Sequence, residues 1–221
     1  GGMFVKESRV TGAGLVVERC TSRQGGCVAV EDSSVVAGKT SLGGDVHLQS
    51  CHAGLGGGAL IVLPPRQHAV INPSLLRGLR ITAATASVGA GIGIAEGAHV
   101  ALHECTIADC VAIVGGGIHA AAESVVDASH TVVQNCSARS GGGLHVDGAA
   151  ATAANMHFRA NFAMATGGAV ALTKSATLHL GLSWASSNVA GAGGGFMSSV
   201  DRSAATLDSS IIANSRTTAQ G

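Results

Sequence analysis

Short stretches in which apolar and polar residues alternate recur along the whole chain. Residues 28–30 (VAV) and 144–146 (LHV) are two examples. Alternation with a period of two predicts β-strands, whereas no stretch shows the 3.6-residue period of an amphipathic helix. The stretches come in groups of three, separated by Gly, Ser, Asn and Asp. These separators are typical turn residues, so the pattern predicts an all-β chain of short strands.

Diglycines divide the chain into repeats. The eight units open at Gly1, Gly25, Gly57, Gly91, Gly115, Gly141, Gly167 and Gly193, with a degenerate pair at the fourth. The last four openings are 26 residues apart each time (115, 141, 167, 193). A fixed period of this length indicates a solenoid in which each repeat forms one turn. We therefore predict a parallel β-helix of about eight coils, with three short strands per coil.

Stacked coils place equivalent residues above one another, so columns of similar residues are expected. The fourth residue of each unit forms an apolar column, which we expect in the interior: Phe4, Val28, Leu60, Ile94, Ile118, Leu144, Val170 and Phe196. A polar column six positions before most diglycines includes Asn135 and Asn161. Asn tolerates the left-handed backbone of a tight corner, and stacked amides can bond between coils. We expect an Asn ladder there, in preference to glycosylation of the sequon at Asn135.

The chain is predicted to be one β-helix segment spanning residues 1–221. Residues 91–221 are the more regular part, and two units are longer than the period, with insertions near residues 31–44 and 64–76. The second insertion begins at Pro64 and Pro65, and proline cannot donate a ladder hydrogen bond. Both ends fit the repeat without an atypical capping unit, so we expect a fragment of a longer protein.

Composition excludes several classes of function. Lys plus Arg equals Asp plus Glu at 13 each, which gives no electrostatic argument for binding nucleic acid. No apolar run approaches the roughly 18 residues of a membrane span, so no membrane span is expected in this segment. Aromatic residues make up only 2% of the chain, so the interior must be built from Ala, Val, Ile and Leu.

Two paired motifs resemble those of a known family. Residues 158–161 (FRAN) precede residues 167–170 (GGAV), and residues 132–135 (VVQN) precede residues 141–144 (GGGL). Residues 184–187 (WASS) keep the aromatic residue and lose the Asn. The combination of GGA[ILV] with FxxN resembles the repeat of polymorphic outer-membrane proteins, whose fold is pectin-lyase-like. The resemblance implies a right-handed parallel β-helix and an extracellular or cell-surface location, and it implies no reaction.

The six cysteines show no CxxC spacing typical of zinc sites. Cys20 and Cys51 hold similar places in neighbouring units, and so do Cys110 and Cys136. Stacked positions ~4.8 Å apart lie within the Cα range of a disulfide, so Cys20–Cys51 and Cys110–Cys136 are candidate bridges. The alternative is that these small residues fill the interior as free thiols.

The acidic residues argue against catalysis. Asp127, Asp147 and Asp201 do not share a column, so they form neither an acid–base pair nor a calcium site. His119 and His145 do share a column, but no third metal ligand follows them, and we expect both on a solvated face. We therefore predict no catalytic residue, no metal and no cofactor.

Basic residues in the third unit are the candidate binding group: Arg66, His68, Arg77 and Arg80. Placed on a loop, they could bind a sugar acid or another anionic partner. The favoured function is a structural or adhesive segment of a surface protein, whose partners are other protein subunits or glycans. The alternatives are a carbohydrate-active enzyme, either a lyase or a hydrolase, and a glycan-binding module without turnover.

Overall fold

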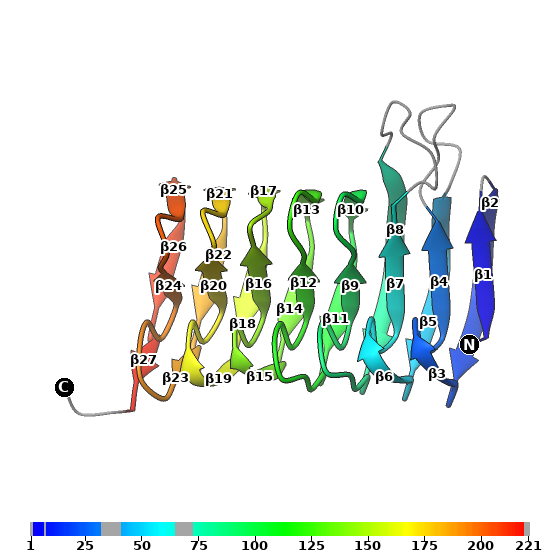
Figure 1. The fold of residues 1–221 in the computed structure, drawn as a ribbon, viewed down its shortest axis with the longest axis horizontal. Helices are drawn as coiled ribbons and strands as arrows, with labels where there is room; N and C mark the ends of the chain where they lie inside the picture. The colour runs from blue at the N-terminus through cyan, green and yellow to red at the C-terminus, as the bar shows by residue number, and fades with distance from the viewer. Residues whose placement is uncertain (1, 7, 32–40, 65–72, 219–221) are drawn as a thin grey trace.

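The computed structural model describes residues 2–6, 8–31, 41–64 and 73–218, which form a parallel β-solenoid (Figure 1). Successive coils lie side by side along one long axis, and their strands pair in parallel. The described residues contain no helix. The first sheet has eight strands, which corresponds to about seven turns, so the predicted all-β parallel β-helix is confirmed.

Most coils contribute strands to three faces of the solenoid, and two coils meet the third face only through isolated bridges at Thr85, Val88, Val111 and Val114. The first sheet contains, in order, β1 (Met3–Lys6), β4 (Val28–Glu31), β7 (Leu60–Leu63), β9 (Ile92–Ile94), β12 (Ile118–Ala120), β16 (Leu144–Asp147), β20 (Val170–Thr173) and β24 (Met197–Ser199). The third sheet contains β15 (Ser137–Ser140), β19 (Phe162–Thr166), β23 (Val189–Ala190) and β27 (Arg216–Thr217), and its counterpart in the early coils is the pair β3 (Thr21–Gln24) and β6 (His52–Gly56).

The second sheet bends at a corner into two arms. Three long strands span both arms: β2 (Arg9–Glu18), β5 (Ser41–Gln49) and β8 (Ser74–Thr82). The first arm continues with β10 (His99–His103), β13 (Val125–Ser129), β17 (Ala150–Ala154), β21 (Thr177–Gly181) and β25 (Ala204–Asp208). The second arm continues with β11 (Thr106–Ala108), β14 (Val132–Gln134), β18 (His157–Arg159), β22 (Trp184–Ser186) and β26 (Ile211–Ala213).

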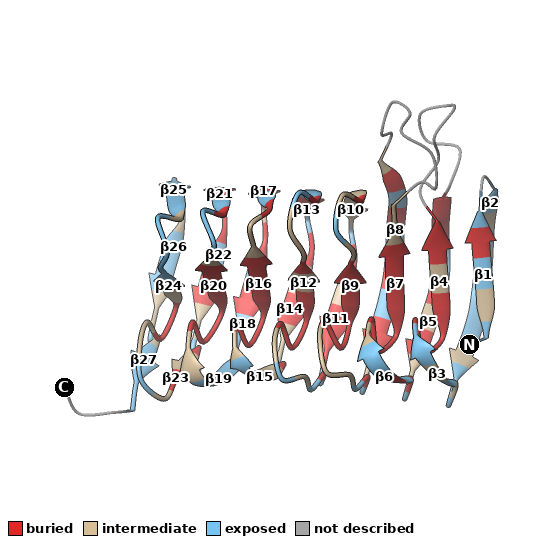
Figure 2. Ribbon diagram, in the orientation of Figure 1, coloured by how far each residue is buried: buried red, intermediate tan, exposed pale blue. Residues whose placement is uncertain are grey.

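The interior is a continuous apolar core that follows the solenoid axis (Figure 2). Val28, Leu60, Ile118, Leu144 and Val170 lie in one column, as predicted, because each pairs with its equivalent in the next coil or with the intervening Ile92. The prediction was wrong for Phe4, Ile94 and Phe196, whose places in the column belong to Met3, Ile92 and Met197.

The left-handed glycine of each turn explains two of these shifts. Gly115 has a φ of 63°, and the equivalent residues are Gly89 in the fourth unit and Gly194 in the eighth. The fourth unit therefore starts two residues before the predicted Gly91, and the eighth starts one residue after the predicted Gly193. In both units several glycines lie close together, at residues 89–93 and 193–195, so the sequence does not show which one adopts the left-handed conformation.

The corner between the second arm and the third sheet is left-handed in every coil. Its residues have φ angles between 51° and 56°: Arg19, Ser50, Ala83, Asp109, Asn135, Ala160, Ser187 and Asn214. The prediction that Asn161 occupies this corner was wrong, because Ala160 does. Asn161 follows it, faces inward and is 1% exposed, and it bonds with the equally buried Asn188. The Asn ladder therefore lies inside the solenoid, whereas Asn135 is exposed at the corner.

The predicted insertions are shorter than expected where the structure describes them. Residues 41–44 belong to β5 and residues 74–76 belong to β8, while residues 32–40 and 65–72 lie outside the described residues. Leu42 and Leu76 are fully buried. Burial of these side chains favours strand structure in segments that were predicted to be loops. β8 begins immediately after Pro73, which cannot itself donate to the ladder.

Candidate functional site

The predicted basic group does not gather on one loop. Arg66 and His68 lie outside the described residues, while Arg77 and Arg80 lie on strand β8 instead of a loop. Arg77 forms an ion pair with Glu104 and lines a depression that also includes Arg9. Arg80 lines a separate depression with His47 and Asp45. The two arginines therefore contribute to different surface features.

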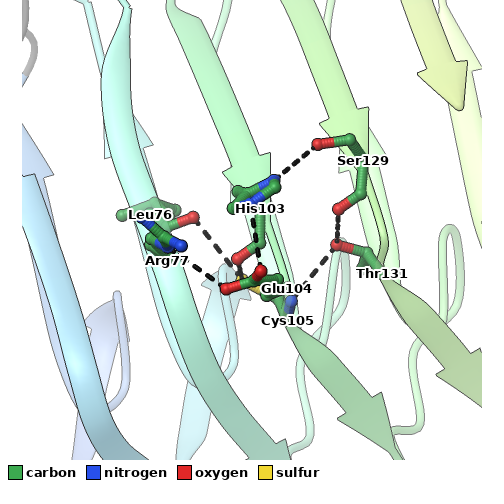
Figure 3. Close-up of polar contacts among 7 residues, drawn as sticks. All are labelled: Leu76, Arg77, His103, Glu104, Cys105, Ser129 and Thr131. Atoms are coloured by element: carbon green, nitrogen blue, oxygen red, sulfur yellow. Dashed lines mark hydrogen bonds and ion pairs between the residues drawn. The ribbon is translucent and has the colours of Figure 1, made fainter. Parts of the chain in front are cut away.

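A hydrogen-bonded cluster surrounds His103 at the bend between the two arms (Figure 3). His103 Nδ1 is 2.8 Å from Ser129 Oγ, and its Nε2 is 3.2 Å from Glu104 Oε1. Arg77 Nε donates to the other oxygen of Glu104 at 3.2 Å. The cluster spans strands β8, β10 and β13, so it links three neighbouring coils. The hydrogen bond from Arg77 lowers the pKa of Glu104, which keeps this exposed carboxylate ionised.

The order serine–histidine–carboxylate in this cluster is the order that activates a nucleophile. Acyl transfer also needs backbone N–H groups that point at the developing oxyanion. Here the His130 N–H donates to the Ala154 carbonyl, and the Val132 N–H donates to the Cys105 carbonyl. These neighbouring N–H groups already donate to carbonyl groups of adjacent coils. The cluster is therefore better explained as a set of side-chain contacts that hold neighbouring coils together.

One disulfide forms, and it differs from the predicted pair. Cys51 is bonded to Cys27, with 5.5 Å between their Cα atoms, and Cys20 is a free, partly exposed thiol. The prediction of Cys20–Cys51 was therefore wrong. Cys27 and Cys51 are both buried, and they meet within the interior instead of along a column. Column spacing alone could not reveal this pairing, because Cys27 belongs to a different sheet position.

The second predicted bridge is absent, since Cys110 and Cys136 are both free thiols. They are buried neighbours, and the hydrogen bond between their side chains raises the pKa of Cys136 well above its usual value, with burial adding to the effect. Burial likewise raises the pKa of Cys105. Cys105 and Cys136 are thus protonated thiols, and all three cysteines fill the core without a disulfide, which is the alternative that the sequence had left open.

His119 and His145 pair in register on β12 and β16 and stack with their ring centroids 5.6 Å apart. The expectation of a solvated face was wrong for His145, which is only 6% exposed. Its Nε2 lies 3.1 Å from Thr173 Oγ1, and the Thr173 hydroxyl donates to Asp147. Thr173 therefore accepts from Nε2–H, which leaves His145 Nδ1 unprotonated and without a hydrogen-bond partner.

Burial controls the charge of this histidine pair. It lowers the pKa of His119 to about 4, with a further contribution from His145. It also lowers the pKa of His145, although Asp147 and the Ser140 carbonyl favour the charged form. Burial alone would raise the pKa of Asp147, but hydrogen bonds from Lys174 and Thr173 outweigh it and lower that pKa. The arrangement therefore places one buried and one half-buried neutral ring beside one ion pair.

Acidification is expected to destabilise the coils that carry these histidines. The unfolded chain binds protons near pH 6.5 and the folded His119 only near pH 4, so stability is complete above about pH 6.5 and falls as the pH drops to about 4. The His119 shift corresponds to about 3 kcal/mol. Urea unfolding at several pH values measures it. His119→Gln should reduce the dependence, leaving the part due to His145, and the exposed His179→Gln should not reduce it. Equal behaviour of the two variants would refute this assignment.

A groove of about 470 Å³ lies on the outer surface of the second arm. Its lining includes Trp184, which is 51% exposed, together with His157, Arg159, Gln134 and Asn214. The His157 and Trp184 rings are 6.4 Å apart between centroids, and their planes are inclined by 32°. This volume falls in the range of small-ligand sites, where apolar surface and a few polar groups converge. This site was not predicted from the sequence, although the single tryptophan of the chain, in the WASS motif, was a signal for it.

The groove belongs to a longer outer column. Strand pairing places Arg80, Thr106, Val132, His157 and Trp184 in one row along the axis, one residue from each successive coil. The depression beside Arg80 lies on this row, two coils before Val132, where the groove begins. One predicted binding residue, Arg80, therefore shares a continuous face with Trp184, which we call the second-arm face.

Within the described residues, no three His, Cys, Asp or Glu side chains gather closely enough to hold a metal ion. The same residues include no helix that is long and apolar enough to cross a membrane. No protein-family model matches the chain, and comparisons with curated proteins and with solved structures likewise find no match.

Proposed function

We propose that this chain is a rigid attachment segment of a surface or extracellular protein, and that it binds its partner without chemical turnover. The second-arm face is the observation that carries the proposal. It presents one outward side chain per coil in a straight row, on strands that are paired on both sides. Such a row suits an elongated ligand that lies along the solenoid axis.

The construction of the stack supports a mechanical role. The coils are joined by backbone hydrogen bonds at each of their strands and turns. Side chains add lateral links, such as the contacts of His103 with Ser129 and of Lys174 with Asp147. In a solenoid of this kind each coil is stabilised by its neighbours, which suits a rigid segment.

Two further observations favour an extracellular or cell-surface location. The buried Cys27–Cys51 disulfide fits an oxidising compartment. The paired motifs at residues 158–161 and 167–170 resemble those of polymorphic outer-membrane proteins, a pectin-lyase-like family of surface β-helices. Partners for such a segment are glycans or other protein subunits of a surface assembly.

The proposal is tested by immobilising the chain and passing acidic, sulfated and neutral polysaccharides over it. Each eluate is analysed for shortened or unsaturated chains. We expect retention of at least one polysaccharide with no change in its length. Release of shortened products would overturn the non-enzymatic proposal, and the absence of retention for every polymer would overturn glycan attachment.

A second candidate function, a carbohydrate-active hydrolase, is favoured only by the contacts of Ser129, His103 and Glu104. In that case Ser129 would react with a fluorophosphonate probe, and Ser129→Ala would abolish the labelling. Because the adjacent backbone donors are engaged between coils, we expect no labelling of Ser129 and no ester hydrolysis above that of the Ser129→Ala variant.

A further inference from the structure

The groove around Trp184 has the chemical features of a saccharide site. Trp184 and His157 come from adjacent coils, and their rings are inclined by only 32°. Trp184 is 51% exposed and offers an aromatic platform of the kind on which the C–H faces of sugar rings stack, with the His157 ring beside it. Gln134, Ser186 and Asn214 surround the platform and can both donate and accept hydrogen bonds. Hydroxyl groups of a sugar require both capacities.

The charge of the groove indicates an acidic ligand. Arg159 lines it, and none of the lining residues is Asp or Glu. No ion pair among the described residues involves Arg159, so its guanidinium is available to a ligand. A guanidinium binds a carboxylate or a sulfate through two parallel hydrogen bonds. We propose that the groove binds an acidic saccharide, with one ring on Trp184 and the carboxylate or sulfate of a neighbouring unit on Arg159.

Other classes of ligand fit the groove less well. A peptide that adds a strand needs an open sheet edge, but β18 is paired with β14 and β22 on its two sides. Single-stranded nucleic acid needs several cations along its backbone, and the groove contains one arginine. A saccharide requires neither feature. This inference rests on the proposed attachment role and specifies the ligand of its second-arm face.

The chain contains a single tryptophan, so its fluorescence reports on this groove alone. We would titrate the whole chain with a uronic-acid tetrasaccharide, with its neutral methyl ester and with a sulfated tetrasaccharide. A saturable change in fluorescence is expected with the acidic sugars and not with the ester. The two acidic probes distinguish recognition of a carboxylate from recognition of a sulfate. Raising the salt concentration should weaken the binding, because an exposed ion pair is screened.

Substitutions assign the binding to the groove, with calorimetry as the measurement. Trp184→Ala and Arg159→Gln should each weaken binding of the acidic sugar by about tenfold or more, which corresponds to the loss of one principal contact. Leu182→Ala is the matched control, because Leu182 is exposed just before β22 and does not line the groove. Circular dichroism of each variant checks that the fold is retained, since all three side chains point outward.

The results separate this inference from the proposed function. Polysaccharide could be retained while the fluorescence of Trp184 does not change and the Trp184→Ala variant binds as tightly as the original chain. That result would refute the groove as the binding site and would leave the proposed attachment function intact. If the neutral methyl ester binds as tightly as the acidic tetrasaccharide, the proposal that the ligand is acidic is refuted. Binding of an oligonucleotide or a polyglutamate peptide as tight as that of the sugars overturns the saccharide class. Absence of any retention overturns both the saccharide site and glycan attachment, and leaves other protein subunits as the partners of the segment.

Discussion

Replacing Gly141 with alanine is expected to destabilise the protein by roughly 2–5 kcal/mol, the sum of two separate costs. Gly141 has a φ of 63°, where a side chain costs about 1–2 kcal/mol. An added Cβ would also lie 2.9 Å from the Cβ of His145 and against the Leu144 carbonyl oxygen. Crowding of this kind costs about 1–3 kcal/mol, because backbone atoms cannot move aside.

Gly97→Ala isolates the first cost. Gly97 has a φ of 72°, yet nothing lies within 4 Å of the position that its Cβ would take. The free energy of unfolding, measured by urea denaturation, should therefore fall by about 1–2 kcal/mol for this variant. Equal losses for Gly97→Ala and Gly141→Ala would show that crowding at the turn is unimportant, contrary to our explanation of the repeated glycines.

Replacing Asn161 with leucine is the second large effect. The Asn161 carboxamide accepts from the Cys136 N–H at 3.0 Å and donates to the Val133 carbonyl at 2.9 Å. Both partners belong to the preceding coil, and neither can reach water once leucine fills the site. Each buried group left without a partner costs about 1–3 kcal/mol, so a loss of roughly 2–6 kcal/mol is expected.

The matched control is Asn135→Ser. Asn135 is exposed at the left-handed corner, and Ser occupies the equivalent corner at Ser50 and Ser187. Its unfolding free energy should change by about 1 kcal/mol or less. Thermal unfolding followed by circular dichroism compares the two variants. If Asn135→Ser were the more damaging, the ladder would lie at the exposed corner, as the sequence alone suggested.

The contrast between these two asparagines shows how the repeat limits a prediction from sequence. Asn135 and Asn161 occupy the same place when counted back from the next diglycine. In the structure they differ by one position, because the segment between corner and glycine has a different length in the two coils. A register shift of one residue exchanges inside for outside, and the counting of motifs cannot detect it.

The histidine pair and the disulfide show a second limit. Periodicity correctly placed His119 beside His145, since stacking follows from the 26-residue spacing. It could not show that His145 is covered, because the close approach of Gly141 and the contact with Thr173 are set by the tertiary structure. Cys27 meets Cys51 across the interior. The repeat predicts which residues stack along the axis, but it does not predict which residues meet across the interior.

The sequence by itself determined the fold class, the stacking direction and most of the interior column. Alternation with a period of two selects strands, and a constant repeat selects parallel stacking, so both are local properties summed over many coils. Only the tertiary structure decided the exact register, the buried Asn161–Asn188 ladder, the disulfide and the groove at Trp184. These depend on which residues of different coils meet, and a single shift of one residue changes every such contact.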